Sequence, residues 1–382
     1  MRRVLELLGE ASLVGLGVVG LSGLAPMPAA AAVALIALGG VLVALHLLSV
    51  TFVRANQAWP SGDASPRPLS IGLVDYAKAL VAWVLGFRRT YAVAPGLYYT
   101  GDCYDRDAPL LVTANYHLTV FLVVRRVRAA NVRLLVIDTD GINVWCAAGK
   151  GRFGNQEIVR QLDRYPRALL TTERRLPLVL PKFGMSGVEL RALRQHDVRP
   201  IVGPLYARDL PDYLASPPLR HRRNDRVDFG LQSRAFVWLP GLIQLVVLSA
   251  LLASAISVVA VPLGAPVQLG VIGVVAALGT VYPLLFPVLP GTRFAIKGLL
   301  LGLAVSAVLL AASWVGGESL LSVFFVVPFT VAAGMLVGLE FTGNSAVANY
   351  SRVKREIVLF VPISALLLVF SAGAFIVVEV LR

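Results

Sequence analysis

The strongest chemical signal in the sequence surrounds Cys146. The segment 138–151 reads Asp-Thr-Asp-Gly-Ile-Asn-Val-Trp-Cys-Ala-Ala-Gly-Lys-Gly and directly follows an apolar run of strand type at residues 133–138. In an open α/β sheet, ligands bind just outside the carboxyl ends of the strands. A short helix over the Ala-Ala pair would hold the thiol near the positive end of a helix dipole, which favours the thiolate. The pattern predicts a nucleophilic or metal-binding thiolate, with a small buried cysteine as the alternative.

The residues around this cysteine suit a large, flat ligand. Lys150 lies four positions after Cys146 and is expected on the same helical face, with a solvated surface charge as its alternative. Trp145, next to Cys146, could stack against the ligand, with a place in the hydrophobic core as its alternative. Small residues let a ligand approach the backbone closely. The small residues of this segment are Ala147, Ala148, Gly149 and Gly151.

The elements that must position this segment alternate between strand and helix from about residue 92 to residue 237. Short apolar strands separated by helices predict a parallel α/β sheet. A helix is expected at 158–162, with Asn155 as its N-terminal cap. The two clearest strands are 110–114 and 133–138, and the weaker ones are 168–171, 178–180 and 200–202.

Most of the remaining chain is apolar enough to lie in lipid. Hydrophobic residues make up 57% and charged residues 15%, with a mean hydropathy of +0.74, whereas soluble domains carry about 25% charged residues. Two runs, 11–25 and 29–53, predict a transmembrane hairpin, although a cleaved signal peptide also has an Arg-rich start and a short apolar core. Five further spans are predicted near residues 240–262, 267–289, 295–315, 319–340 and 357–381.

A Pro- and Ser-rich linker and a helix at 74–87 are predicted between the hairpin and the sheet. This helix either lies in the plane of the membrane interface or packs into the core. The predicted organisation is a transmembrane hairpin at 1–56, a linker and interfacial helix at 57–91, an α/β domain at 92–238 and a five-helix membrane domain at 239–382.

The basic residues predict the sidedness of the chain. If the α/β domain is cytoplasmic, the basic loops at 293–297 and 352–355 also lie inside, and the two opposite turns carry no Lys or Arg. This arrangement follows the positive-inside rule. It predicts a multi-pass protein of the cytoplasmic membrane, in a reducing setting where Cys103 and Cys146 stay thiols rather than forming a disulfide.

Several other classes of protein are disfavoured. The net charge of +13 would suit a nucleic acid as the partner, but no helix-turn-helix, zinc-finger or aromatic RNA-binding motif is present. A basic domain tethered to a bilayer is explained more simply by attraction to anionic headgroups. Two cysteines cannot make a Cys-rich zinc or iron–sulfur site, which needs about four ligands. A transporter with a soluble domain is disfavoured because the spans hold little charge apart from Glu340 and Glu379.

Residues 143–151, Asn-Val-Trp-Cys-Ala-Ala-Gly-Lys-Gly, resemble the cap-helix signature of the mercury-methylating corrinoid protein family. That family is related to the corrinoid domain of the corrinoid iron–sulfur protein. The resemblance runs from about residue 92 to residue 356 and does not cover the first ninety or so residues. Arg152 and Asn155 replace the usual threonines after the signature. Further similar stretches are 95–98, 112–116, 138–139, 180–187, 203–204, 341–345 and 353–356.

The resemblance implies a Rossmann-like corrinoid-binding domain joined to all-α transmembrane helices. The implied cofactor is cobalamin, with the thiolate of Cys146 as the lower axial ligand of cobalt. The chain lacks the Asp-x-His-x-x-Gly motif that would indicate a His-ligated cobalamin. The expected corrin contacts are Thr113, Asn143, Val144, Trp145, Cys146, Ala147, Ala148, Gly149, Lys150, Gly151, Gly184, Gly203 and Pro204.

The implied activity is the methylation of Hg(II) to methylmercury through a Cys-ligated methyl-cobalt species. A soft thiolate opposite the methyl group pushes electron density toward the carbon, which suits transfer to a soft electrophile. The methyl group would come from a methyl-tetrahydrofolate pathway, and the electrons from a ferredoxin-like iron–sulfur protein. Another methyl acceptor is the alternative within the same chemistry. Cys103, in the polar loop 101–107, is expected to have no function, with a mercury relay as its alternative.

Overall fold

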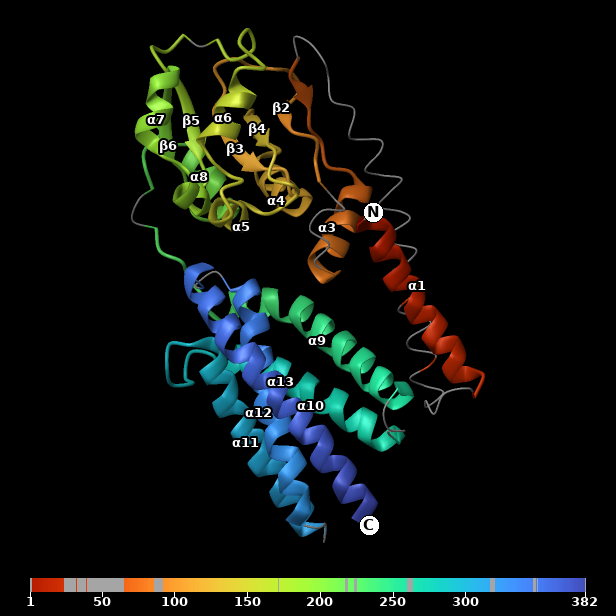
Figure 1. Ribbon diagram of the computed structural model, residues 1–382. Coiled ribbons are helices and arrows are strands. Elements are labelled where there is room, and N and C mark those ends of the chain that lie inside the picture. Colours follow the sequence, from red (N-terminus) through yellow and green to blue (C-terminus); the bar gives the residue numbers. More distant parts are fainter. Residues whose placement is uncertain are drawn as a thin grey trace. The chain divides into compact units, whose positions relative to one another are not determined.

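The computed structural model describes residues 2–23, 32, 39, 65–85, 92–170, 172–216, 219–222, 225–259, 264–316, 320–345, 348 and 350–381. The chain forms two compact units, Ala44–Val227 and Met1–Val43 with Asp228–Arg382 (Figure 1). The first is a Rossmann-like α/β unit and the second consists of apolar helices, which confirms the predicted fold class. The C-terminal part of the helical unit begins at Asp228, whereas the predicted boundary follows residue 238.

The α/β unit is built on a six-stranded mixed sheet with the order β1-β2-β4-β3-β5-β6. Strands β4, β3, β5 and β6 are parallel neighbours, whereas β2 runs antiparallel to β4. The prediction of a parallel sheet is therefore wrong at one edge. The loop from β2 to β3 is too short for the crossover that parallel strands need. The strands are β1 (Arg67–Pro68), β2 (Gly96–Tyr99), β3 (Leu110–Ala114), β4 (Arg133–Ile137), β5 (Leu176–Leu180) and β6 (Val198–Val202).

Four of the five predicted strands are confirmed, as β3, β4, β5 and β6. The prediction of a strand at 168–171 is wrong for its described residues, 168–170. Leu169 is buried, but its N–H donates to the carbonyl of Tyr165 at 3.0 Å. Because this bond is local, Leu169 fills the core from a turn and needs no neighbouring strand.

The predicted helix at 158–162 is α6 (Asn155–Leu162), but the predicted cap is wrong. Gly154 is the N-cap and Asn155 is the first helical residue. The Asn155 side chain instead donates to the carbonyl of Glu189 at 2.8 Å and accepts from its N–H at 2.9 Å. A tertiary contact thus replaces the local capping bond.

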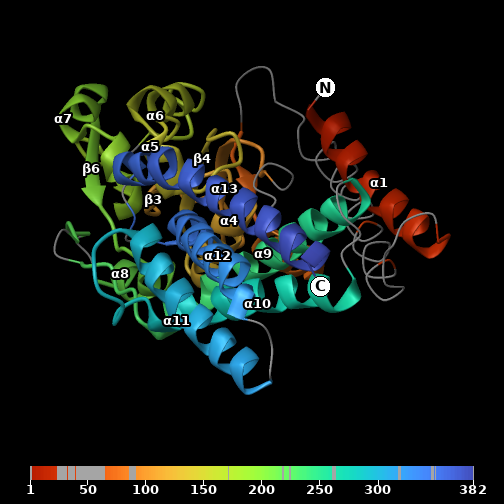
Figure 2. The ribbon, with the colours of Figure 1, turned by 60° about the horizontal axis from the view of Figure 1, so that its bottom comes forward.

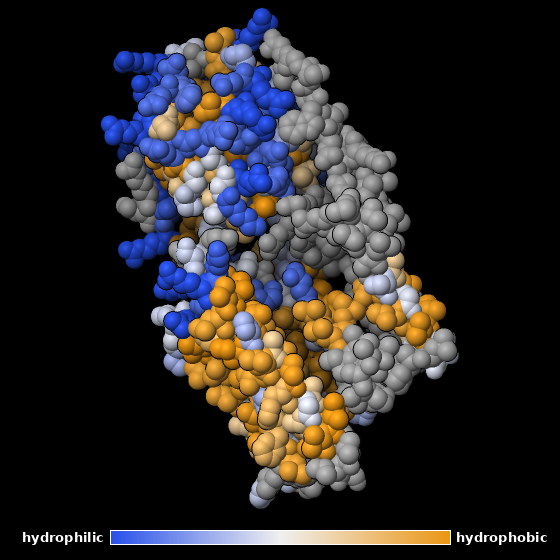
Figure 3. Space-filling view, in the orientation of Figure 1, coloured by the Kyte–Doolittle hydropathy of each residue, from blue (hydrophilic) through white to orange (hydrophobic). Residues whose placement is uncertain are grey.

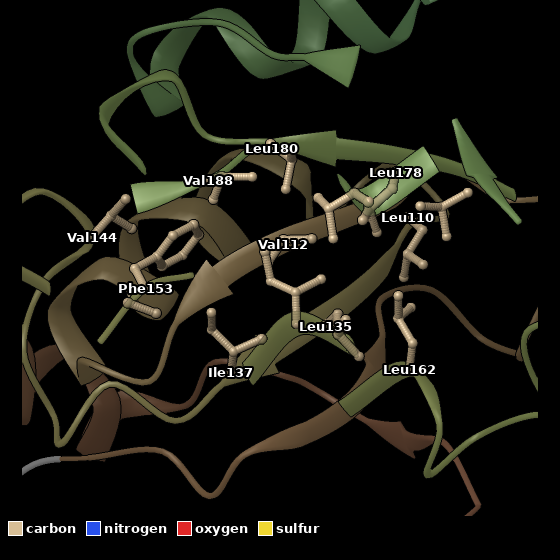
Figure 4. Packing of buried hydrophobic residues seen from close by; sticks show 14 of the residues in the cluster. Leu110, Val112, Leu135, Ile137, Val144, Phe153, Leu162, Leu178, Leu180 and Val188 are labelled. Carbon is tan, nitrogen blue, oxygen red and sulfur yellow. The ribbon is translucent and has the colours of Figure 1, made fainter. Parts of the chain in front are cut away.

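Helices cover both faces of the sheet. One face carries α5 (Val144–Gly149), α6 and α7 (Leu190–Leu193), and the other carries α4 (His117–Val127) and α8 (Leu210–Leu214). Strand residues alternate between the two faces. In β3, Leu110 and Val112 belong to the α5 side, whereas Leu111 belongs to the α4 side. Phe153 lies beside Val144 and Val188 in the first core (Figure 4).

Among its described residues, the second unit contains five helices long and apolar enough to cross a membrane, which confirms the five spans predicted after residue 238. Apolar side chains dominate their surface, in contrast to the α/β unit (Figure 3). The helices are α9 (Leu231–Val259), α10 (Ala265–Leu285), α11 (Phe294–Val315), α12 (Val323–Asn344) and α13 (Tyr350–Leu381). The first run of the predicted hairpin, 11–25, overlaps α1 (Arg2–Leu21), whose apolar part, Ala11–Leu21, is shorter than a membrane span. The second run, 29–53, lies outside the described residues except for Ala32 and Gly39.

Helices α11 and α12 lie side by side (Figures 1 and 2) and approach through facing glycines. A Cβ on Gly298 would lie 2.0 Å from the carbonyl oxygen of Gly334, and one on Gly334 would lie 2.2 Å from that of Gly298. Gly302 and Gly338 make equally close approaches to the opposite backbone. The two Gly-x-x-x-Gly pairs allow this packing because the four glycines have no side chain to separate the two backbones.

Charged side chains fix one end of this bundle. The Nη1 of Arg234 donates to the carbonyls of Pro283 at 3.0 Å and Leu284 at 3.1 Å, at the C-terminus of α10. Oε2 of Glu356 accepts from the N–H of Ala295 at 3.1 Å, at the N-terminus of α11. A cation at a helix C-terminus and an anion at an N-terminus both complement the helix dipole. The bonds of Arg234 also explain why α9 begins at Leu231 rather than near residue 240.

Candidate functional site

The candidate site is formed where β3 and β4 end and α5 begins. Asn115 directly follows β3 and is 4% exposed. Its Oδ1 accepts from the N–H of Thr139 at 3.0 Å and from that of Gly141 at 2.9 Å, and its Nδ2 donates to Oδ1 of Asp138 at 3.1 Å. One buried amide thus holds the loop after β4 against the end of β3.

The loop reverses direction through two residues with left-handed backbone. Asp140 has φ 58° and Gly141 has φ 67°. The Thr139 hydroxyl lies 2.9 Å from Asn115 Oδ1 and 2.7 Å from the carbonyl oxygen of Ile142, and closes the turn. Aspartate and glycine both tolerate this conformation. The turn brings the chain from β4 directly into α5.

Helix α5 is anchored on one side and accessible on the other. Asn143 is its N-cap and its Oδ1 accepts from the N–H of Cys146 at 2.9 Å. The buried side consists of Val144, Ala147 and Ala148, which belong to the core of the sheet. The accessible side consists of half-buried Trp145 and Cys146 with exposed Gly149 and Lys150. Cys146 also packs partly against this core, so its half-buried thiol lies at the border between the buried and the accessible sides of the helix.

The far side of α5 contacts η1 (Lys182–Gly187), the 3-10 helix that follows β5. A Cβ on Gly187 would lie 2.1 Å from the carbonyl oxygen of Phe153 and 3.2 Å from the Cα of Ala148. A Cβ on Gly184 would lie 2.5 Å from the Phe153 ring. Gly184 was predicted as a corrin contact, but its open side is occupied by Phe153. Both glycines permit close packing behind α5.

Three other predicted contacts lie apart from the accessible side of α5. Thr113 is buried in β3 and shares the strand face of Leu111, which is covered by α4 and α8. Gly203 and Pro204 follow β6, the edge strand, and are buried. The N–H of Gly203 donates to the carbonyl of Leu180 at 2.9 Å, so this glycine extends the sheet pairing. Gly151, with φ 69°, ends the turn after α5 and is exposed.

Ionic groups surround the base of the loop. The N–H of Asp138 donates to Oε1 of Glu157 at 3.1 Å, and Oε2 of Glu157 pairs with Nε of Arg160 at 2.7 Å. The hydrogen bond to Glu157 raises the pKa of Arg160 above its ordinary value. Arg152 pairs with Asp140 at 3.4 Å, and both are largely exposed. With Lys150, Arg152 places two cations within six residues of Cys146 along the chain.

The sequence reasoning missed Asn115 and Glu157 as supports of the site. A signal for Asn115 was available, because a polar amide directly after a buried strand often bonds to a neighbouring loop. Cys103 and Cys146 are both free thiols, exposed and half-buried respectively. Over the described ranges, no group of three or more His, Cys, Asp and Glu residues could hold a metal ion.

No protein-family model matches the chain, and no curated protein matches it. The resemblance of residues 143–151 to the corrinoid family therefore remains an expectation from the sequence alone.

Proposed function

We propose that this membrane protein binds cobalamin and transfers a methyl group to Hg(II), with Cys146 as the lower ligand of cobalt. The observation that supports the proposal is the half-buried thiol of Cys146, carried on a capped helix beside the carboxyl ends of parallel strands. Ligands of open α/β sheets bind at this edge. The residues from 143 to 151 add the family resemblance.

The open backbone on the accessible side of α5 supports the proposal of a large ligand there. A Cβ on Gly149 or Gly151 would meet no atom within 4 Å, so the backbone beyond the thiol is open. A single thiolate is a suitable donor for a metal whose other ligands belong to the ligand itself. Bound there, cobalamin would supply the organometallic chemistry of methyl transfer, while the protein supplies the donor and its orientation.

The protein's own contribution is to hold the thiol in place. Asn115 fixes the loop before α5, and Asn143 caps the helix at the N–H of Cys146. The buried side chains of Val144 and Ala147 pack into the core and prevent the helix from rotating about its axis. Cys146 releases its proton to solvent when it becomes a ligand, which its half-buried position permits. Such rigid support from surrounding residues is what a metal-ligating side chain requires.

The remaining reactants must come from partners. Two cysteines are too few for an iron–sulfur cluster, so we propose a ferredoxin-like protein as the electron donor and a methyl-tetrahydrofolate pathway as the methyl source. The basic loops at 293–297 and 352–355 support a cytoplasmic location for the α/β unit. Both partners would then have access to α5.

The test uses the full-length chain in detergent micelles, loaded with cobalamin, as wild type, Cys146→Ala, Cys146→His and Cys103→Ala. We expect a thiolate-ligated optical spectrum in the wild type and in Cys103→Ala, its loss in Cys146→Ala, and an altered spectrum in Cys146→His. With a low-potential reductant, methylmercury should form in the wild type and in Cys103→Ala, more slowly in Cys146→His, and not in Cys146→Ala. Undiminished methylation by Cys146→Ala would overturn the axial-thiolate mechanism. A thiolate-ligated spectrum without methylation of Hg(II) would refute Hg(II) as the methyl acceptor but would leave the corrinoid site supported.

A further inference from the structure

The helix α3 (Leu73–Leu85) has one side that packs onto the α/β unit. Ala79 and Ala82 are 4% and 1% exposed and lie on this side. The Tyr116 hydroxyl donates to the carbonyl of Ala82 at 3.3 Å. Asp75 lies 3.2 Å from Nε2 of His117, at the first turn of α4. These contacts fix the rotation of α3 about its own axis.

The opposite side of α3 is apolar and uncovered. Leu73 is 88% exposed, Leu80 is 57% exposed and Val74 is 50% exposed. Leu73, exposed Ala77 and Leu80 are spaced by four and three residues, so they form one stripe along the helix. A contiguous apolar surface of this kind marks an interaction site rather than ordinary solvent exposure.

Cations flank the apolar stripe. Lys78 belongs to α3 itself, and the guanidinium of Arg125 on α4 lies 5.9 Å from the centre of the Tyr76 ring. The surrounding unit is also basic, since 26 of the 35 Lys and Arg residues but only 15 of the 22 Asp and Glu residues fall within Ala44–Val227. Two copies of such a surface would repel each other, whereas anionic lipid headgroups would attract it.

A bilayer is held close to this unit by the chain itself. The first membrane-spanning helix, α9, begins at Leu231, shortly after the α/β unit ends at Val227. A short tether keeps the effective concentration of membrane surface high. An apolar helical stripe flanked by cations is the pattern of helices that lie in the plane of the membrane interface.

We propose that α3 is an in-plane membrane anchor whose stripe of Leu73, Ala77 and Leu80 inserts at the boundary between headgroups and acyl chains, with Val74 beside it. Lys78 and Arg125 contact anionic headgroups beside it. The anchor gives the α/β unit a second attachment besides the link to α9, and therefore a fixed orientation on the membrane. This inference does not depend on the proposed function.

The test uses the full-length chain with Cys103→Ala and Cys146→Ala, reconstituted in vesicles of phosphatidylcholine and phosphatidylglycerol. A single cysteine is introduced by Leu80→Cys, and in a second variant by Leu73→Cys, and is labelled with a fluorophore. Leu170→Cys is the matched control, because Leu170 is 59% exposed and Leu80 is 57% exposed on the same unit. Quenching by lipids with a spin label high on the acyl chain is then measured.

We expect several-fold stronger quenching at positions 80 and 73 than at position 170. Equal, weak quenching at all three positions would overturn the proposal. Disulfide-linked dimers of the unlabelled Leu80→Cys variant under an added oxidant, without lipid quenching of the labelled variant, would assign the stripe to a contact between copies and would overturn the proposal too. In vesicles of phosphatidylcholine alone, we expect weaker quenching; undiminished quenching there would refute the role of Lys78 and Arg125.

Discussion

The contact between η1 and α5 makes a sharp prediction for Gly187→Ala. A Cβ at this position would lie 2.1 Å from the carbonyl oxygen of Phe153, whereas carbon–oxygen contacts close at about 3.3 Å. The clash is with backbone, so no side-chain rotation relieves it. Either η1 or the segment that carries Cys146 must move by roughly 1 Å, a distance that follows from the same contact limit.

The expected cost can be compared with a substitution of the same type nearby. Overpacking of a well-packed interior costs about 1–3 kcal/mol and occasionally more. Gly149→Ala is the matched control, because its Cβ would meet no atom within 4 Å and the position is helical. Alanine stabilises a helical position by roughly 0.5–1 kcal/mol relative to glycine. The two variants should therefore differ by about 1.5–4 kcal/mol in the free energy of unfolding.

Two measurements on the full-length chain in micelles test this reasoning. Hydrogen exchange of the β3 and β5 amides reports the stability of the α/β unit, and the alkylation rate of Cys146 reports the attachment of α5. We expect faster exchange and faster alkylation in Gly187→Ala, and no acceleration of exchange in Gly149→Ala. If Gly187→Ala exchanges as slowly as the wild type, the close approach of η1 to α5 is refuted.

Three further predictions concern the loop, the membrane helices and pH. Asn115→Leu leaves two backbone N–H groups without their acceptor, at about 1–3 kcal/mol each, so hydrogen exchange around β4 should accelerate strongly, whereas the same substitution at exposed Asn131 should have little effect; equal effects would contradict the role of Oδ1. Gly334→Leu should lower the melting temperature of the helical unit in micelles because its Cβ already meets the Gly298 backbone, whereas Gly270→Leu, with open space around its Cβ, should not; similar melting of both would refute the facing glycines. Burial lowers the pKa of His117 below its ordinary value. As the pH drops below about 6.5, His117 therefore binds a proton in the unfolded chain but stays neutral in the folded chain, and the free energy of unfolding should fall. His117→Gln should flatten this part of the pH–stability curve, and an unchanged slope would show that another titrating group causes the pH dependence.

The sequence alone determined those features whose signals are local. The strands β3 and β4 were predicted from continuous apolar runs, and the five spans from stretches of lipid-compatible length. The Ala-Ala pair predicted a short helical turn after Cys146, and the helix found there, α5, begins two residues before it. In each case the physical cause, burial or capping, acts over a few neighbouring residues.

The tertiary structure decided what depends on partners distant in sequence. Asn115 supports the loop at Gly141 across twenty-six positions, and Asn155 bonds to Glu189 instead of capping its own helix. Arg234 lies inside α9 because carbonyls of α10 accept its hydrogen bonds. The Gly-x-x-x-Gly spacing on α11 and α12 is visible in the sequence, but the pairing of their glycine faces is not. Hydrogen bonds and close contacts of this kind are chosen by the packed fold, since many local patterns can form them and only the fold brings one pair together.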